Sequence, residues 1–261
     1  MNDARVALVT GAARGIGAAT VRALAAQGWA VLAVDRAADD PALPYRLGTG
    51  VELSAVAGCG GDVRPFVADV RDPQALAAAV AEAERRWGGL DAAIAVAGVI
   101  AGGVPLWQVP PEQEQAVLDV NLHGVLHLAR AAVPALLRRP EPRSGRFVAV
   151  ASAAATRGLP MLAAYCAAKA GVAGLIRALA VELGGSGVTA NAVSPGSTDT
   201  PILAESARLY GLPGAAAFAA QQPAGRLLDP DEVAAVLAFL AGPSSSAVTG
   251  AIVPADGGLA L

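Results

Sequence analysis

The stretch RVALVTGAARGIGAATVRALAAQGWA, residues 5–30, decides the fold of this chain. It begins with a short, almost wholly apolar run at 5–11, which predicts a buried strand. A glycine-rich turn follows, and apolar residues at helical spacing then predict a helix over 15–30 that ends near Gly28. A strand, a glycine-rich turn and a helix in this order are typical of the first unit of a dinucleotide-binding α/β fold.

The turn itself, TGAARGIG at 10–17, has the chemistry that a pyrophosphate needs. Its glycines permit a tight turn and a close approach of the backbone to a ligand, and the helix after it presents free N–H groups. The spacing is G-x-x-x-G-x-G rather than G-x-G-x-x-G. We expect the contacts to come from Gly11, Arg14, Gly15, Ile16 and Gly17.

The rest of the chain repeats the alternation of short apolar runs and longer helical patterns. Strands that are apolar on both faces and alternate with amphipathic helices predict a parallel sheet that is covered on each side. The fold class is therefore α/β: a single-domain, doubly wound parallel sheet of Rossmann type over residues 1–261, with helices on both faces. Further strands are predicted at 31–35, 63–70, 90–98, 145–153, 188–196 and 250–258, and further helices at 73–89, 111–139, 161–185 and 229–242, with a short helical piece near 51–57.

The composition argues against several classes of protein. The 261 residues carry a formal net charge of -3, with 54% hydrophobic and 16% charged residues. Neither nucleic acid nor an anionic membrane is an expected partner for a mildly acidic chain. The uncharged runs at 92–111 and 233–255 are interrupted by glycine, proline or serine, and lipid would leave their backbone groups unpaired. No membrane span is predicted there, and the N-terminus lacks the pattern of a secretory signal.

Metal-binding side chains are few. Cys59 and Cys166 are far apart and lack metal-ligand spacing, which favours a reduced, cytoplasmic protein. His123 and His127 stand four residues apart on a predicted helix, a spacing that can chelate zinc, but no third ligand is evident. No metal site is predicted.

Asp35, at the end of the second predicted strand, bears on the choice of cofactor. A carboxylate there accepts hydrogen bonds from both hydroxyls of an adenosine ribose and repels a 2′-phosphate. Arg14 and Arg36 favour the opposite choice, because either could pair with a phosphate. The alternative is that neither arginine binds a phosphate: Arg14 is then simply exposed, and Arg36 lies flat against adenine. The sequence predicts NAD, with NADP the less favoured alternative, and places Asp69 where it can reach the adenine amino group.

The chain has 19 lysine and arginine residues, and Lys169 is the only lysine among them. It follows Tyr165 by four residues, so both side chains project from one face of a predicted helix. A nearby cation lowers the pKa of a phenol, which is otherwise about 10 and too high for a base at neutral pH. A compact ammonium group can lie beneath the phenol, whereas the planar arginine fork is bulkier. The pair predicts a proton-transfer site, and Ser152 stands at a strand end where it can bind a substrate oxygen.

Six motifs together resemble those of the short-chain dehydrogenase/reductase family, over nearly the whole chain. Ser152 precedes Tyr165 by the family's usual spacing. One departure is AVAG at 95–98, where the family commonly has N-N-A-G or N-A-G, so one cofactor-side contact is missing. The motifs are TGAARGIG at 10–17, ADV at 68–70, VNL at 120–122, Ser152, YCAAK at 165–169 and PGSTDT at 195–200.

The resemblance implies a role for each residue of the site. Tyr165 is the general acid/base, and Ser152 orients and polarises the carbonyl. Lys169 holds the nicotinamide ribose and lowers the pKa of Tyr165, and Asn121 holds a water in a proton relay behind Lys169. A homotetramer is implied as well, with the long helix at 111–139 in a subunit interface. Further cofactor contacts are implied for Asp69, Val70, Ala97, Gly98, Pro195, Gly196, Thr198 and Thr200.

Residues 37–61 form a longer connection than the fold requires. Together with VIAGGVPLW at 99–107, they resemble a subgroup coupled to the redox peptide cofactor mycofactocin, in which NAD is held tightly beneath the added loop. Tyr45 and Leu47 would then cover the cofactor. The alternative is an ordinary surface excursion.

The walls of the substrate site are expected from segments 99–107, 153–162 and 201–222, and the last of these is a predicted mobile lid. Their apolar side chains favour a hydrophobic secondary alcohol or ketone over a sugar or a phosphate ester. The expected wall residues are Val99, Ile100, Leu106, Trp107, Leu159, Met161, Leu162, Ile202, Leu203, Tyr210, Leu212 and Phe218.

Three functions are open at this point. The first is an NAD-dependent dehydrogenase of secondary alcohols. The second is an NADPH-dependent 3-oxoacyl-carrier-protein reductase, which Asp35 disfavours. The third is a dinucleotide-sensing protein without catalysis, which would not need Ser152, Tyr165 and Lys169.

Overall fold

A computed structural model describes residues 4–261 and contains one seven-stranded, fully parallel sheet. The strands lie in the order β3-β2-β1-β4-β5-β6-β7. This order confirms the predicted doubly wound α/β fold, because the chain builds outward from β1 in one direction and then from β4 in the other. The strands are β1 (Val6–Thr10), β2 (Ala30–Asp35), β3 (Val63–Val67), β4 (Ala92–Ala95), β5 (Arg146–Val150), β6 (Thr189–Pro195) and β7 (Ile252–Ala255).

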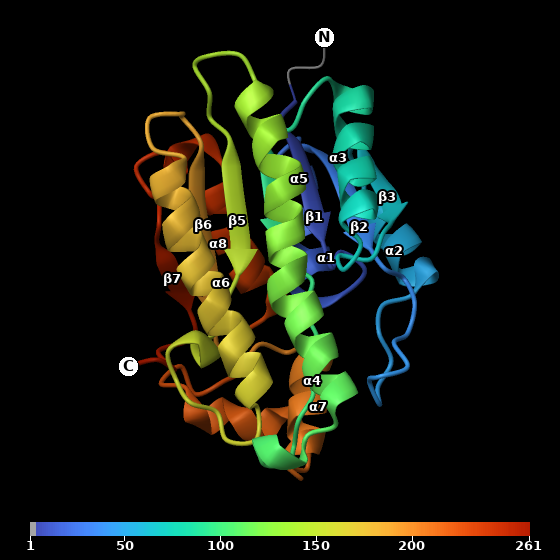
Figure 1. The fold of residues 1–261 in the computed structure, drawn as a ribbon, viewed down its shortest axis with the longest axis vertical. Coiled ribbons are helices and arrows are strands. Elements are labelled where there is room, and N and C mark those ends of the chain that lie inside the picture. The colour runs from blue at the N-terminus through green and yellow to red at the C-terminus, as the bar shows by residue number, and fades with distance from the viewer. Residues whose placement is uncertain (1–3) are drawn as a thin grey trace.

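Helices cover both faces of the sheet, as Figure 1 shows, with α3, α5 and α6 in front and α1 and α8 behind. α7 lies beyond the carboxyl ends of the strands, next to the chain that connects β4 to α4. The helices are α1 (Gly15–Ala26), α2 (Gly50–Ala57), α3 (Pro73–Trp87), α4 (Pro111–Leu118), α5 (Gly124–Arg138), α6 (Ala163–Glu182), α7 (Pro201–Leu209) and α8 (Pro230–Ala241).

Two hydrophobic cores explain why the central strands β1 and β4 are almost wholly apolar. Alternate residues of a strand point to opposite faces. In β1, Val6 and Leu8 belong to the core beneath α3, α5 and α6, whereas Ala7 and Val9 belong to the core beneath α1 and α8. Both faces are therefore buried, as a parallel sheet requires.

Local signals in the sequence set the helix ends. α3 begins after Asp72, whose side chain accepts hydrogen bonds from the N–H groups of Gln74 and Ala75, and ends at Gly88, which has a φ of 80°. Asp229 caps α8 with a capping box. Such caps satisfy the backbone groups that a helix end leaves unpaired.

The predicted long helix at 111–139 is present as one helical stretch, Pro111–Arg138. Within it, residues Asp119–His123 form a π-helical turn between α4 and α5, which the sequence analysis did not predict. A π turn adds a residue to the helical repeat and so rotates the side chains that follow. Here it directs Asn121, which is fully buried, toward the chain that leaves β4.

Two helical stretches, Pro111–Arg138 and Ala163–Glu182, are long and apolar enough to cross a membrane by length and composition alone. In this fold α5 packs on β4 and β5, and α6 packs on β5 and β6. Core helices of a folded domain pass the same test, so the two stretches are weak evidence for a membrane span.

The reversal of strand order lies between β1 and β4. At such a reversal the connections leave toward opposite faces of the sheet, and a crevice opens at the carboxyl ends of the strands. The glycine-rich turn after β1, Asp35 at the end of β2 and Ser152 after β5 all lie at this edge.

Candidate active site

A cleft of about 720 Å³ lies at the carboxyl edge of the sheet. Every catalytic and cofactor-binding residue that the sequence predicts lines it except Asn121. Sites of this size accept a small ligand together with part of a cofactor. The predicted residues that line the cleft are Gly11, Arg14, Gly15, Ile16, Gly17, Asp35, Arg36, Asp69, Val70, Ala97, Gly98, Ser152, Tyr165, Lys169, Pro195, Gly196, Thr198 and Thr200.

The turn after β1 fits a dinucleotide because it has no room for side chains. Gly11 has a φ of +68°, and a Cβ atom built on it would lie 2.6 Å from the Cα of Ala97. A Cβ atom on Gly17 would overlap the carbonyl oxygen of Gly11. Thr10 Oγ1 accepts hydrogen bonds from the N–H groups of Val96 and Ala97, at 3.2 and 3.3 Å, and so joins the turn to the AVAG segment.

Replacing Gly17 with alanine is expected to lower the free energy of unfolding by about 2 kcal/mol or more, because a core without space must shift to accept the methyl group. NADH affinity should fall at least about tenfold. Urea unfolding and NADH titration measure the two effects. Gly174→Ala is the control, since nothing lies within 4 Å of that added methyl group. A Gly17→Ala protein as stable as the wild type would contradict the prediction.

Asp35 is held in place by backbone donors. Its Oδ2 accepts a hydrogen bond from the N–H of Ala13 at 3.0 Å, and its Oδ1 accepts one from the N–H of Ala37 at 2.9 Å. Each carboxylate oxygen has a second lone pair for a ligand hydroxyl. Gly48 approaches closely, because a Cβ atom there would lie 3.2 Å from Asp35 Oδ1.

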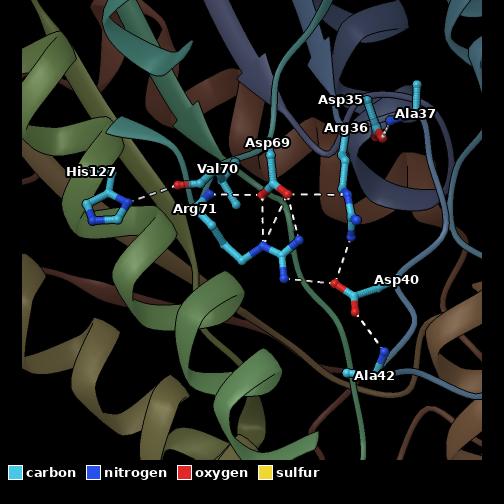
Figure 2. Close-up of polar contacts among 9 residues, drawn as sticks. All are labelled: Asp35, Arg36, Ala37, Asp40, Ala42, Asp69, Val70, Arg71 and His127. Carbon is cyan, nitrogen blue, oxygen red and sulfur yellow. Dashed lines mark hydrogen bonds and ion pairs between the residues drawn. The ribbon is translucent and has the colours of Figure 1, made fainter. Parts of the chain in front are cut away.

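Arg36 and Asp69 have partners that the sequence did not reveal (Figure 2). Arg36 Nε lies 3.2 Å from Asp69 Oδ2, and Arg71 Nη2 lies 2.7 Å from the same oxygen. Asp69 Oδ1 accepts from the N–H of Arg71 at 3.0 Å. Arg36 also pairs with Asp40 at 2.7 Å. An adenine amino group would therefore compete with two guanidinium groups for Asp69.

Tyr165 and Ser152 lie together in the cleft. The Ser152 side chain follows β5 and accepts a hydrogen bond from the N–H of Ala154 at 3.1 Å. Burial raises the pKa of Tyr165, and the Ser152 hydroxyl opposes that shift. The net shift is upward, opposite to the lowering by Lys169 that the sequence predicts.

Lys169 lies one turn along α6 from Tyr165 and is almost fully buried, with 3% of its surface exposed. Its Nζ donates a hydrogen bond to the carbonyl oxygen of Val150 at 2.8 Å and lies 5.8 Å from the centre of the Tyr165 ring. Burial lowers the pKa of Lys169 to about 8. The structure thus brings the predicted pair together at the edge of the sheet.

The buried ammonium predicts a pH effect on stability. The pKa of Lys169 is about 8 in the folded protein and about 10.4 in an unfolded chain. Between these values the unfolded chain binds more protons, so stability rises with pH. From pH 8 to 9.5 the free energy of unfolding should rise by about 1 to 2 kcal/mol relative to Lys169→Met. Tyrosines ionise above this window. Urea unfolding of both proteins at both pH values tests this, and equal pH dependence would contradict it.

Asn121 is the predicted catalytic residue that does not line the cleft. Its Oδ1 accepts from the N–H of Val99 at 2.9 Å, and its Nδ2 donates to the carbonyl oxygen of Val99 at 2.8 Å. A Cβ atom on Gly98 would lie 3.1 Å from that Oδ1 and 3.8 Å from Lys169 Nζ. The Asn121 amide therefore holds Val99 in place in the chain that follows β4. The neighbouring residue, Gly98, lies close to the Lys169 ammonium group.

The segment after β6 is held by its own hydrogen bonds. Thr198 Oγ1 donates to the carbonyl oxygen of Gly196 at 3.1 Å, and Thr200 Oγ1 caps α7 by accepting from the N–H of Leu203 at 3.3 Å. A Cβ atom on Gly15 would lie 3.3 Å from Thr200 Cγ2. Thr200 thus lies next to the glycine-rich turn, and both threonines line the cleft.

Part of the long connection at 37–61 lies against the catalytic end of the cleft. Tyr45 accepts a hydrogen bond at its hydroxyl oxygen from the N–H of Ile100, at 2.9 Å, and burial raises the pKa of Tyr45 to about 12. Tyr45 and Leu47 pack in a small core with Val99 and Tyr165. This segment is packed against the chain rather than being a free surface excursion.

Most of the predicted substrate wall lines the cleft, but Leu106, Trp107 and Met161 do not. Leu106 and Trp107 are exposed, and the backbone oxygen of Met161 accepts a hydrogen bond from Gly103. Their apolar character alone could not reveal which side they face. The wall residues that line the cleft are Val99, Ile100, Leu159, Leu162, Ile202, Leu203, Tyr210, Leu212 and Phe218.

Each of the two histidines contacts another group of the same chain through its Nδ1 atom. His123 Nδ1 lies 2.8 Å from Asp119 Oδ1, and His127 Nδ1 lies 3.0 Å from the carbonyl oxygen of Val70. Within residues 4–261, no group of three or more histidine, cysteine, aspartate or glutamate side chains is arranged to hold a metal ion.

Fold and cleft together define a dinucleotide-binding protein with a serine, a tyrosine and a lysine at one end. Residues 11–260 match a family model described as enoyl-(acyl carrier protein) reductase. The chain is 41% identical over 258 residues to cis-4-hydroxycyclohexanecarboxylate dehydrogenase from Sinomonas cyclohexanicum, a match that covers 97% of this chain and 96% of that protein. The chain belongs to the short-chain dehydrogenase/reductase family of oxidoreductases, as its motifs predict.

Two solved structures are similar over almost their whole length. Carveol dehydrogenase from Mycobacterium avium in complex with NAD has a TM-score of 0.92 and 32% identity, covering 99% of this chain and 98% of that one. A variant of actinorhodin polyketide ketoreductase with NADPH has a TM-score of 0.87 and 33% identity, covering 100% and 98%. This fold therefore accepts either nicotinamide dinucleotide.

Proposed function

We propose that this protein is an NAD-dependent oxidoreductase that interconverts a hydrophobic secondary alcohol and its ketone. The observation that carries the proposal is the meeting of Ser152, Tyr165 and Lys169 in one cleft whose wall is apolar. A site without catalysis would need none of the three. The similar proteins named for carveol and for a hydroxycyclohexane carboxylate support an alcohol on a ring as the first substrates to try.

NAD, when bound, supplies the acceptor of the hydride. Tyr165 takes the proton of the substrate hydroxyl in the oxidation and returns it in the reduction. Ser152 Oγ donates a hydrogen bond to the substrate oxygen and holds it beside the phenol. Because burial raises the pKa of Tyr165, the phenolate needs the positive charge of Lys169 at neutral pH.

Asp35 supports NAD as the cofactor. Its fixed carboxylate suits two ribose hydroxyls and opposes a 2′-phosphate. The contacts of the pyrophosphate, adenine and carboxamide are assigned to the predicted cofactor residues that line the cleft. Titration with NADH and NADPH tests the choice, and tighter binding of NADPH would favour the 3-oxoacyl-carrier-protein reductase instead.

The activity itself is tested by the absorbance of reduced nicotinamide with a panel of cyclic secondary alcohols and NAD. We expect turnover with at least one of them. Binding of NADH without turnover of any alcohol or ketone would favour the dinucleotide-sensing function, and binding of neither dinucleotide would overturn the proposal.

The proposal also includes an oligomeric state, a mobile lid and a cellular location for this enzyme. α5 and α6 lie side by side on one surface (Figure 1), and Val181 of α6 is 82% exposed, which supports a homotetramer through this layer. Sedimentation analysis tests the homotetramer.

Residues 201–222 would move as a lid over the substrate. Cys59 and Cys166 are both free thiols, as a cytoplasmic location would leave them.

The most specific part of the proposal is that this enzyme is coupled to mycofactocin. The packing of Tyr45 and Leu47 against the catalytic end supports a loop that closes over the cofactor. If it does, the purified protein should carry NAD that exchanges slowly. Denaturing the protein and assaying the released dinucleotide tests this, and a protein that is free of NAD and turns over with added NAD would contradict it.

A further inference from the structure

Asp40 is a buried carboxylate, with 5% of its surface accessible, between the exposed residues Asp39 and Pro41. Its Oδ2 lies 2.7 Å from Arg36 Nη1 and 2.8 Å from Arg71 Nη1 (Figure 2). Its Oδ1 accepts a hydrogen bond from the N–H of Ala42 at 2.9 Å. Both oxygens are therefore bonded, and the side chain has a fixed position at the adenosine end of the cleft, which it lines.

Four side chains of alternating charge form a closed ring there. Arg36 lies between Asp40 and Asp69, and Arg71 lies between the same two carboxylates. Figure 2 shows the two guanidinium groups directed toward the two carboxylates. Burial works to raise the pKa of Asp40, but the Ala42 N–H, Arg36 and Arg71 outweigh it and hold that pKa below its usual range. Asp40 is thus ionised at neutral pH.

Arg36 directly follows Asp35, at the position from which a cation could reach a ribose 2′-phosphate. A free guanidinium binds phosphate through two parallel hydrogen bonds. In this protein Nη1 of Arg36 is paired with Asp40 and its Nε with Asp69, so the group is already turned toward two carboxylates. To bind a phosphate, Arg36 would have to leave a buried carboxylate with one partner fewer, and that is costly in a low-dielectric environment.

We propose that Asp40 determines cofactor selectivity by withholding Arg36 from the 2′-phosphate of NADP. The inference rests on the proposed dinucleotide site and goes beyond Asp35. Asp35 accepts hydrogen bonds only from backbone N–H groups among residues 4–261 and makes no ion pair there. Asp35 therefore opposes the phosphate directly, whereas Asp40 acts through Arg36 as a positioning residue.

The test measures dissociation constants of NADH and NADPH for the wild type and Asp40→Asn, by nicotinamide fluorescence. Asparagine keeps the shape of the side chain and the acceptor for the N–H of Ala42, but it loses the charge that pairs with Arg36 Nη1 and leaves Asp69 as the remaining carboxylate partner of Arg36. We expect NADPH affinity to rise about tenfold, as for one new hydrogen bond to a charged group, and NADH affinity to change much less.

Asp39→Asn is the matched control. Asp39 is exposed in the same segment, and its Oδ1 accepts from the N–H of Leu47 at 2.8 Å, which asparagine can also do. The control removes the same charge one residue away without touching Arg36. An equal rise of NADPH affinity in Asp39→Asn would mean a general charge effect and would overturn the inference.

Arg36→Gln completes the cycle. Added to Asp40→Asn, it should abolish the gain in NADPH affinity, and a gain that survives would overturn the role of Arg36. In the wild-type background it should leave the ratio of NADH to NADPH affinity within about threefold, because Arg36 is already withheld. A larger loss for NADPH would overturn the inference even if Asp40→Asn did not fold.

Thermal unfolding establishes whether Asp40→Asn is folded. A folded variant with unchanged NADPH affinity would refute the inference while leaving the proposed function intact. A wild type that binds neither dinucleotide would overturn the proposed function and this inference with it.

Discussion

Replacing Tyr165 with phenylalanine is expected to lower kcat for alcohol oxidation by about 10³-fold, within the usual range for loss of a general acid/base. Phenylalanine keeps the ring that packs beside Val99 and Tyr45 and removes only the hydroxyl group. The proton of the substrate hydroxyl then has no acceptor at the right place. NADH affinity should change far less than turnover, because the shape of the cleft is kept.

The measurement is steady-state turnover together with NADH titration. Tyr210→Phe is the comparison, since Tyr210 lines the same cleft but donates its hydroxyl hydrogen to the carbonyl oxygen of Pro160 at 2.8 Å. That change should alter KM more than kcat. A Tyr165→Phe enzyme with more than about a tenth of wild-type kcat would refute the acid/base role.

Replacing Lys169 with arginine is expected to lower kcat at least about 10²-fold, although the charge is kept. The site is built for one compact cation, because Lys169 is buried and Nζ donates to the carbonyl oxygen of Val150. Arginine brings a planar group with five N–H donors that must all find partners, and it does not lose its proton in proteins. Steric displacement would move the charge away from the phenol of Tyr165.

Arg177→Lys is the matched control for this substitution. Arg177 lies on the exposed side of the same helix, so the reverse exchange should leave kcat and stability unchanged within about 0.5 kcal/mol. Turnover and thermal unfolding should be measured for both variants. A stable Lys169→Arg enzyme with near-normal kcat would show that any cation serves, and the account of the lone lysine would fail.

The sequence by itself determined the fold class and the centre of the site. Periodicity distinguishes buried strands from amphipathic helices, and the turn at 10–17 needs glycines that leave a visible pattern. Tyr165 and Lys169 share one helix face by spacing alone, so their meeting did not depend on distant segments. Ser152 was predictable because a residue that follows a parallel strand must lie at the carboxyl edge.

Only the tertiary structure decided the rest. The π turn at Asp119–His123, the bond of Asn121 to Val99 and the outward direction of Trp107 depend on how segments meet in space. The partners of Asp40 are the clearest case, because Arg71 is 31 positions along the chain and follows a different strand. Local spacing fixes which residues share a face, whereas long-range packing fixes which charges are bonded and which are free to bind a ligand.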